Sequence, residues 1–134
     1  AAEVLAEAAA HRALHGVEAV FLDRVTSGPE HLAHYAGLAA RLPRPLLLNP
    51  GVRPDPGYLA LAAVVVTFEG DWAAHRALTG PDPAGRTWHL VHGVPRTAQP
   101  AVLRRAAELG ASLAYATDRR MPNPWDGLPG GWPG

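Results

Sequence analysis

Residues 63–69 have the sequence AVVVTFE, a nearly continuous apolar run of strand length that is rich in β-branched side chains. Four similar runs accompany it along the chain. They are VEAVFLD at 17–23, PLLLN at 45–49, TWHLVH at 87–92 and SLAYATD at 112–118. Apolar runs without strict alternation are typical of strands that are buried on both faces of a parallel sheet.

Helical patterns lie between these runs, at Ala1–His15, Ser27–Arg41, Asp71–Leu78 and Thr97–Leu109. The second is predicted to begin with a capping box formed by Ser27 and Glu30. Asp71 is predicted to cap the third helix, and Gly110 is predicted to end the fourth. Strands that alternate with helices in this way predict βαβ units with parallel strands.

The ends of the apolar runs recur every 20–26 residues, which is the period of a βα repeat. A complete (β/α)8 barrel needs about 200–250 residues, so 134 residues hold about five units. We therefore predict an α/β fold of TIM-barrel-like repeats, a partial or shortened (β/α)8 barrel. Residues 1–134 would form a single domain or its C-terminal part. The open sheet edges predict either a homo-oligomer or a missing N-terminal barrel segment.

Composition narrows the class of partner. The formal net charge is zero, with twelve Arg and no Lys, so we expect neither nucleic acid nor an anionic membrane as the partner. The chain has no Cys and no apolar run near the ~20 residues that span a bilayer. It starts at Ala1 without signal-peptide features, so we expect a start inside a longer gene.

Known cofactor and nucleophile motifs are missing from the sequence. It contains no GxGxxG, P-loop or GxSxG pattern. His11 and His15 stand four residues apart, and His31 and His34 three apart, but neither pair belongs to an HExxH motif. We interpret these histidines as exposed helix residues and predict neither a metal site nor an organic cofactor.

Each of the five apolar runs ends in a polar residue, and these residues are Asp23, Asn49, Glu69, His92 and Asp118. Active sites of parallel α/β folds lie at the carboxyl ends of the strands. If the runs form adjacent strands, the five side chains meet at one mouth. The sequence therefore predicts a polar site there.

Glu69 and Asp23 are the candidate catalytic residues. Glu is a poor turn residue, and Glu69 directly follows an apolar run, so we interpret it as functional rather than as a surface partner of an Arg. Asp23 is a candidate nucleophile, base or electrostatic stabiliser, and its alternative role is a turn that binds local amides. Glycoside hydrolysis uses two carboxylates that flank the scissile bond, and this pair meets that need.

The remaining candidates are substrate-binding residues. Asn49 precedes Pro50-Gly51 in a predicted tight turn, and its amide is a candidate for holding a sugar hydroxyl. His92 is a site candidate or a core histidine. Asp118 is a site candidate or an ion-pair partner of the arginines that follow it.

Aromatic side chains near the strand ends are candidates for stacking on sugar rings. They are Trp72, Tyr115, Trp125 and Trp132, each with plain packing as the alternative. The tail 121–134, MPNPWDGLPGGWPG, is too rich in Pro and Gly for a helix or a central strand. We predict that it wraps over the domain or forms a loop near the site.

The chain resembles the spherulation-specific family 4 (spherulin-4-like) proteins. The resemblance rests on NPG at 49–51, Tyr58, VTFEG at 66–70, YATD at 115–118 and NPWD at 123–126, with FLD at 21–23 as the strand that ends in an acidic residue. It implies a (β/α)8 barrel and an endo-acting hydrolase, secreted or attached to the cell surface, that cuts α-1,4-linked N-acetylgalactosamine in galactosaminogalactan. It also implies Asp23 and Glu69 as the essential carboxylates and no cofactor.

Two departures from the family pattern bear on activity. The family's acidic motif often has a second carboxylate beside the Asp, where this chain has Arg24. The family also has further strands before the one that ends at Asp23, so we expect about three βα units of the barrel to lie outside residues 1–134. These departures keep two further interpretations open, a non-catalytic carbohydrate-binding relative and a structural fragment that works with an absent segment.

Overall fold

The sheet has five parallel strands in the order of the sequence. The computed structural model describes residues 1–130, and Trp132 lies outside this range. The strands are β1 (Val20–Leu22), β2 (Leu46–Leu48), β3 (Val64–Asp71), β4 (Thr87–His92) and β5 (Leu113–Ala116). Their order is β1-β2-β3-β4-β5, and every neighbouring pair is parallel. This is the strand order of successive βα units in a barrel.

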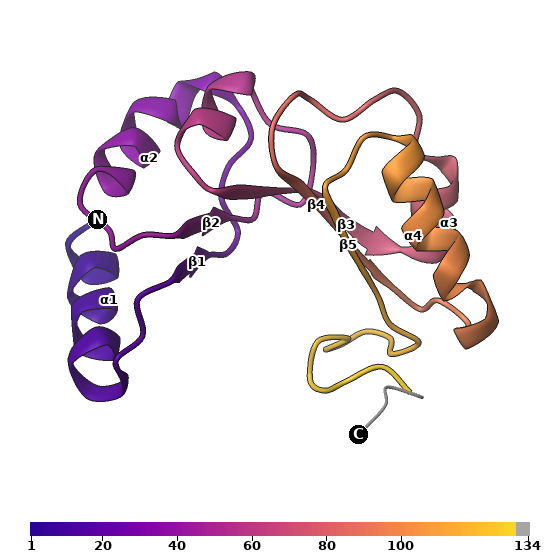
Figure 1. The fold of residues 1–134 in the computed structure, drawn as a ribbon. Helices are drawn as coiled ribbons and strands as arrows, with labels where there is room; N and C mark the ends of the chain where they lie inside the picture. Colours follow the sequence, from indigo (N-terminus) through magenta and orange to yellow (C-terminus); the bar gives the residue numbers. More distant parts are fainter. Residues whose placement is uncertain (131–134) are drawn as a thin grey trace.

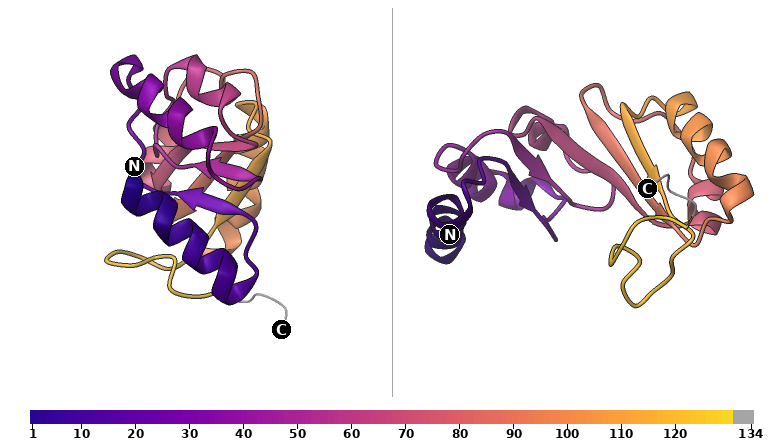
Figure 2. Two further views of the ribbon diagram at one scale, coloured as in Figure 1. Left: turned by 90° about the vertical axis from the view of Figure 1, so that its left-hand side faces the viewer. Right: turned by 60° about the horizontal axis from the view of Figure 1, so that its bottom comes forward.

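Helices connect the strands and lie on the convex side of the curved sheet (Figure 1). They are α1 (Ala2–His15), α2 (Leu32–Ala39), α3 (Trp72–Ala77) and α4 (Gln99–Glu108), with 3-10 turns at Pro29–His31, Pro56–Ala60 and Arg96–Ala98. Figure 2 shows the sheet as an open trough with the helices outside it. The chain is therefore a partial (β/α) barrel, as the sequence predicted.

Two apolar clusters hold the helices on the sheet. The first packs α2 against β2 and β3 around Leu38, Leu46 and Tyr58, with the α1 side chains Val4 and Leu5 partly buried at its edge. The second packs α4 against β3, β4 and β5, and its members are Phe68, Val91, Val94, Val102 and Ala116. The alternate side chains of the strands face the concave side, which is where the polar site lies.

Several local predictions are confirmed. Asp71 caps α3 by accepting a hydrogen bond from the amide of Ala74 at 2.7 Å. Gly110 follows α4 with a φ of 93°, and Gly51 has a φ of 70° in the predicted turn. Left-handed angles of this kind favour glycine, because a Cβ atom would strain them.

Two local predictions are wrong. Ser27 and Glu30 form no capping box, because the helix begins with a 3-10 turn at Pro29 and no side chain caps α2. The carbonyl of Ser27 instead accepts a hydrogen bond from the amide of Asp55 at 2.8 Å, which ties this loop to its neighbour. Strand β3 also continues two residues beyond Glu69, because Gly70 and Asp71 still pair with β4.

Within residues 1–130, no helix is long and apolar enough to cross a bilayer. Over the same residues, no group of three or more acidic or histidine side chains is placed to hold a metal ion.

Candidate functional site

Asp23, Asn49 and Glu69 meet on the concave side of the sheet, at or near the carboxyl ends of β1, β2 and β3. Asn49 Nδ2 donates to Asp23 Oδ1 at 2.9 Å and to Glu69 Oε2 at 2.5 Å. One buried amide thus joins two carboxylates that are 46 positions apart in the sequence. The structure brings together the three residues that the sequence placed at the ends of the first three runs.

Backbone pairing beyond the strands fixes these positions. The amide of Asn49 donates to the carbonyl of Leu22 at 2.8 Å, so the parallel ladder reaches the residue before Asp23. The amide of Glu69 donates to the carbonyl of Gly51 at 2.9 Å, so the turn after β2 is tied to β3. The left-handed Gly51 allows the chain to turn there without moving Asn49 from the strand end.

Trp125 reaches the same carboxylate from the C-terminal segment. Its Nε1–H donates to Glu69 Oε1 at 2.9 Å, while Asn49 donates to the other oxygen. Both Glu69 oxygens therefore accept from groups that can only donate, an indole and an amide N–H. The two hydrogen bonds hold the carboxyl group of Glu69 in one orientation.

A pocket of about 350 Å³ surrounds these groups and is lined by Phe21, Asp23, Asn49, Glu69, Trp88, Leu90, Tyr115 and Trp125. Its polar groups lie on one side and its walls are mainly aromatic and aliphatic. Its size is within the range of small-molecule sites, about 300–1,000 Å³. Aromatic walls of this kind suit the apolar faces of a sugar ring.

A second hollow, of about 570 Å³, opens on the other side of the carboxylates. It shares Asp23, Asn49, Glu69 and Trp125 with the pocket, and its further lining residues are Arg24, Pro50, Gly51 and Met121–Pro124. The two carboxylates consequently line both spaces.

The other predicted site residues are placed as follows. Tyr115 and Trp125 line the pocket, with ring centroids 6.0 Å apart. The ring centroids of His92 and Trp125 are 6.1 Å apart, and His92 lines a separate hollow together with Trp72. Asp118 is outside both spaces, and its Oδ2 accepts from Arg96 at 3.2 Å.

Asp118 forms hydrogen bonds that hold the C-terminal segment in place. Its Oδ1 accepts from the amide of Gly130 at 2.8 Å. This backbone hydrogen bond, followed by the one from Arg96, lowers the pKa of the Asp118 carboxyl below its usual range. The structure therefore places Asp118 as an anchor of the C-terminal segment, and Trp72 apart from the carboxylates.

Three residues that line the pocket were not predicted from the sequence, and they are Phe21, Trp88 and Leu90. In β4, Trp88 and Leu90 face the pocket, whereas the residues between and after them, His89 and Val91, are fully buried on the helix side. This two-residue period was present in the run TWHLVH and would have identified both walls. Phe21 had no comparable signal, because β1 is only three residues long.

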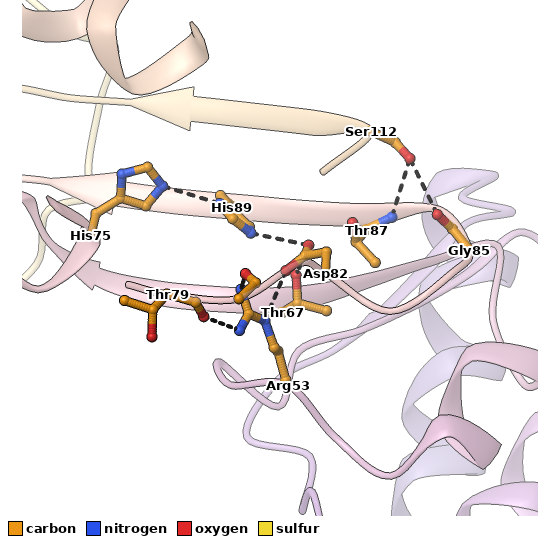
Figure 3. Close-up of polar contacts among 10 residues, drawn as sticks. Arg53, Thr67, His75, Thr79, Asp82, Gly85, Thr87, His89 and Ser112 are labelled. Carbon is orange, nitrogen blue, oxygen red and sulfur yellow. Dashed lines mark hydrogen bonds and ion pairs between the residues drawn. The ribbon is translucent and has the colours of Figure 1, made fainter. Parts of the chain in front are cut away.

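A second polar cluster, also missed, lies between the sheet and the helices (Figure 3). Asp82 Oδ2 accepts from Thr67 Oγ1 at 2.7 Å and lies 3.1 Å from His89 Nε2. His89 Nδ1 in turn lies 3.0 Å from His75 Nε2. Asp82 Oδ1 accepts from Arg53 Nε at 3.1 Å. The cluster fastens the 79–86 loop to β3, β4 and α3.

The pKa shifts in this cluster indicate a neutral His75 close to a charged Asp82. Burial alone would raise the pKa of Asp82, but hydrogen bonds from His89, Thr67 and Arg53 outweigh it and hold that pKa well below its usual range. Burial, together with nearby His89 and Arg105, lowers the pKa of His75 to about 4. Because a charged carboxylate only accepts, His89 Nε2 donates to Asp82.

Comparison with known proteins agrees with this picture. The family model described as spherulation-specific family 4 matches residues 1–134. The crystal structure of Aspergillus clavatus Sph3 in complex with GalNAc matches with a TM-score of 0.77 and 22% sequence identity, covering 98% of this chain. The chain spans 63% of the length of Sph3. No curated protein sequence matches the chain.

Proposed function

Since the chain belongs to the spherulation-specific family 4, we propose that it is a glycoside hydrolase domain that cleaves an amino-sugar exopolysaccharide with Asp23 and Glu69. The family match and the structural similarity to Sph3, which was crystallised with GalNAc, support a glycoside hydrolase-like fold. The observation that carries the proposal is the pair of carboxylates bridged by Asn49 inside an aromatic pocket. Glycoside hydrolysis needs two carboxyl groups on either side of one bond.

The substrate class follows from the family and from the shape of the site. The resemblance to family 4 implies α-1,4-linked N-acetylgalactosamine, and Sph3 was crystallised with GalNAc. The carboxylates line two hollows, of about 350 Å³ and 570 Å³. Two neighbouring spaces that share the carboxylates support cleavage inside a chain, with sugar units on both sides of the scissile bond.

The hydrogen bonds favour one division of roles. Both oxygens of Glu69 accept from donor-only groups and are held in place, which suits a group that faces the developing oxocarbenium ion in a fixed orientation. Over residues 1–130, Oδ2 of Asp23 has no hydrogen-bond partner, so this oxygen is free to carry a proton to the glycosidic oxygen. We therefore assign Glu69 as nucleophile or electrostatic stabiliser and Asp23 as general acid.

The spacing of the pair favours retention of configuration. The two bonded oxygens are closer together than the sum of their distances to Asn49 Nδ2, 2.9 Å and 2.5 Å. That upper bound is below the roughly 6.5–9.5 Å typical of inverting enzymes and within reach of the roughly 5–5.5 Å typical of retaining ones. An inverting mechanism would need room for a water molecule between the sugar and the base.

One observation favours a second function, carbohydrate binding without cleavage. Arg24 occupies the position beside Asp23 where the family often has a second carboxylate, and it has a left-handed φ of 54°. Its side chain lines the second hollow. If the missing carboxylate is essential, the domain binds the polymer through its aromatic walls but does not cleave it.

Release of reducing ends from partly deacetylated galactosaminogalactan tests the proposal. The parent chain is expected to release them, and Glu69→Gln is expected to lose release while remaining folded by circular dichroism. Glu18→Gln, an exposed carboxylate far from the site, is the matched control and should retain activity. No release by a folded parent that still binds the polymer would reject hydrolysis and support the binding function.

A further inference from the structure

The segment after β5 folds into a strap, residues 119–130, that is fastened at several points. The guanidinium of Arg119 donates to Asp126 Oδ1 at 2.6 Å and to the carbonyl of Leu128 at 3.1 Å. The amide of Gly130 donates to Asp118 at 2.8 Å. The strap thus loops back at the carboxyl end of β5 as a closed unit (Figures 1 and 2).

Trp125 is the strap residue that makes a hydrogen bond inside the site. Its Nε1 is 2.9 Å from Glu69 Oε1. Its ring lies against Tyr115 of β5, with centroids 6.0 Å apart, and meets His92 of β4 edge to face at 6.1 Å. Two rings from neighbouring strands therefore fix the plane of the indole. The strap fixes how far the indole reaches into the pocket.

We propose that Trp125 is a positioning residue that holds the carboxylate of Glu69 in one orientation. The indole N–H fixes Oε1, and the amide of Asn49 fixes Oε2, so rotation about the last torsion of Glu69 is blocked from both sides. An indole N–H does not titrate in the range of enzyme activity and cannot accept a proton. The strap thereby becomes part of the site rather than a cover over it. This inference rests on the proposed function of Glu69.

The side chain of Trp125 contributes to the site in two separate ways. The ring of Trp125 forms a wall of the pocket, and its N–H holds the carboxylate. Trp125→Phe keeps an aromatic wall and removes only the donor. Because misplacement of a reacting group by about 1 Å costs roughly 100-fold in rate, we expect kcat to fall 10- to 100-fold with little change in KM. Trp125→Ala should also raise KM, because the wall is lost.

The split between kcat and KM gives a readout that a purely structural role would not change. Loss of the N–H in Trp125→Phe should lower kcat alone, because the aromatic wall that contacts the substrate remains. Arg119→Gln, which removes the hydrogen bonds from Arg119 to Asp126 and Leu128, should also lower kcat. The controls Leu128→Ala, an exposed strap side chain, and Arg104→Gln, on the surface of α4, should behave like the parent.

A measurement without substrate separates this inference from the proposed function. The indole 15N–1H signal of Trp125, assigned by its loss in Trp125→Phe, should have a different chemical shift in Glu69→Gln, because the carboxylate that accepts from the indole becomes an amide. It should stay in place in Glu18→Gln. An indole signal with the same chemical shift in the parent and in Glu69→Gln overturns the inference, whether or not the chain cleaves polymer. Unchanged kcat in Trp125→Phe of an active parent also overturns it. An inactive parent whose signal follows Glu69 rejects the hydrolase and supports the pairing.

Discussion

Acidification should destabilise this domain through His75, a histidine with no exposed surface. Its pKa is lowered from 6.5 to about 4, first by burial and then by His89 and Arg105. Between these two pH values the unfolded chain binds a proton at this position and the folded chain does not. Stability therefore rises with pH in this window and is lost as the pH falls from 6.5 to 4.

The expected magnitude follows from the size of the shift. One pKa unit corresponds to 1.36 kcal/mol, so His75 should remove roughly 3 kcal/mol over the window. A small domain has about 5–15 kcal/mol in total, so this single residue is a large share. His75→Gln removes the titration, and its amide nitrogen still reaches His89 Nδ1, where His75 Nε2 lies at 3.0 Å.

Urea unfolding followed by circular dichroism at several values between pH 7 and pH 4.5 measures the effect. The parent should lose about 2–3 kcal/mol more than His75→Gln over this range, at a constant urea dependence of the unfolding free energy. His31→Gln, an exposed histidine on the turn before α2, is the control and should follow the parent. Equal losses in the parent and in His75→Gln would refute the neutral state of the buried His75.

Three other substitutions test the site and the core. Asp82→Asn should cost about 3–5 kcal/mol in urea unfolding, because buried donors lose their charged partner. Asn49→Ala should lower reducing-end release about 100-fold in a folded protein, because Glu69 loses one of its two donors, and unchanged release would contradict the bridge. Tyr58→Phe should cost about 1 kcal/mol through the lost bond to the carbonyl of Gly28 and leave release unchanged.

The strand pattern could be predicted because parallel strands produce local signals. Each run is apolar on both faces, and its polar end predicts the mouth, so the run ends placed Asp23, Asn49 and Glu69 at one edge of the sheet. The predicted end of β3 at Glu69 was wrong, because Gly70 resembles a stop signal. Its pairing with Val91 depends on β4 and is invisible in the local sequence.

The remaining contacts depend on tertiary structure. Trp125 and Glu69 are 56 positions apart and meet only because the strap returns across β4 and β5. Asp82 lies in a Pro-rich loop whose composition predicts an exposed turn, yet its side chain has no exposed surface because His89 and Thr67 receive it from the neighbouring strands. No local pattern records which strand residues a loop will meet.

The order of the strands explains why the middle residue of the site is an amide. Neighbouring strands are about 4.8 Å apart, so the ends of β1, β2 and β3 hold three side chains in a row. A carboxyl group at the middle position would place three acidic side chains next to one another. Repulsion between their charges would raise the free energy of ionising each of them. Asn49 instead gives one hydrogen to each neighbour and so holds both carboxyl groups in place. With both N–H groups engaged, Asn49 positions Asp23 and Glu69.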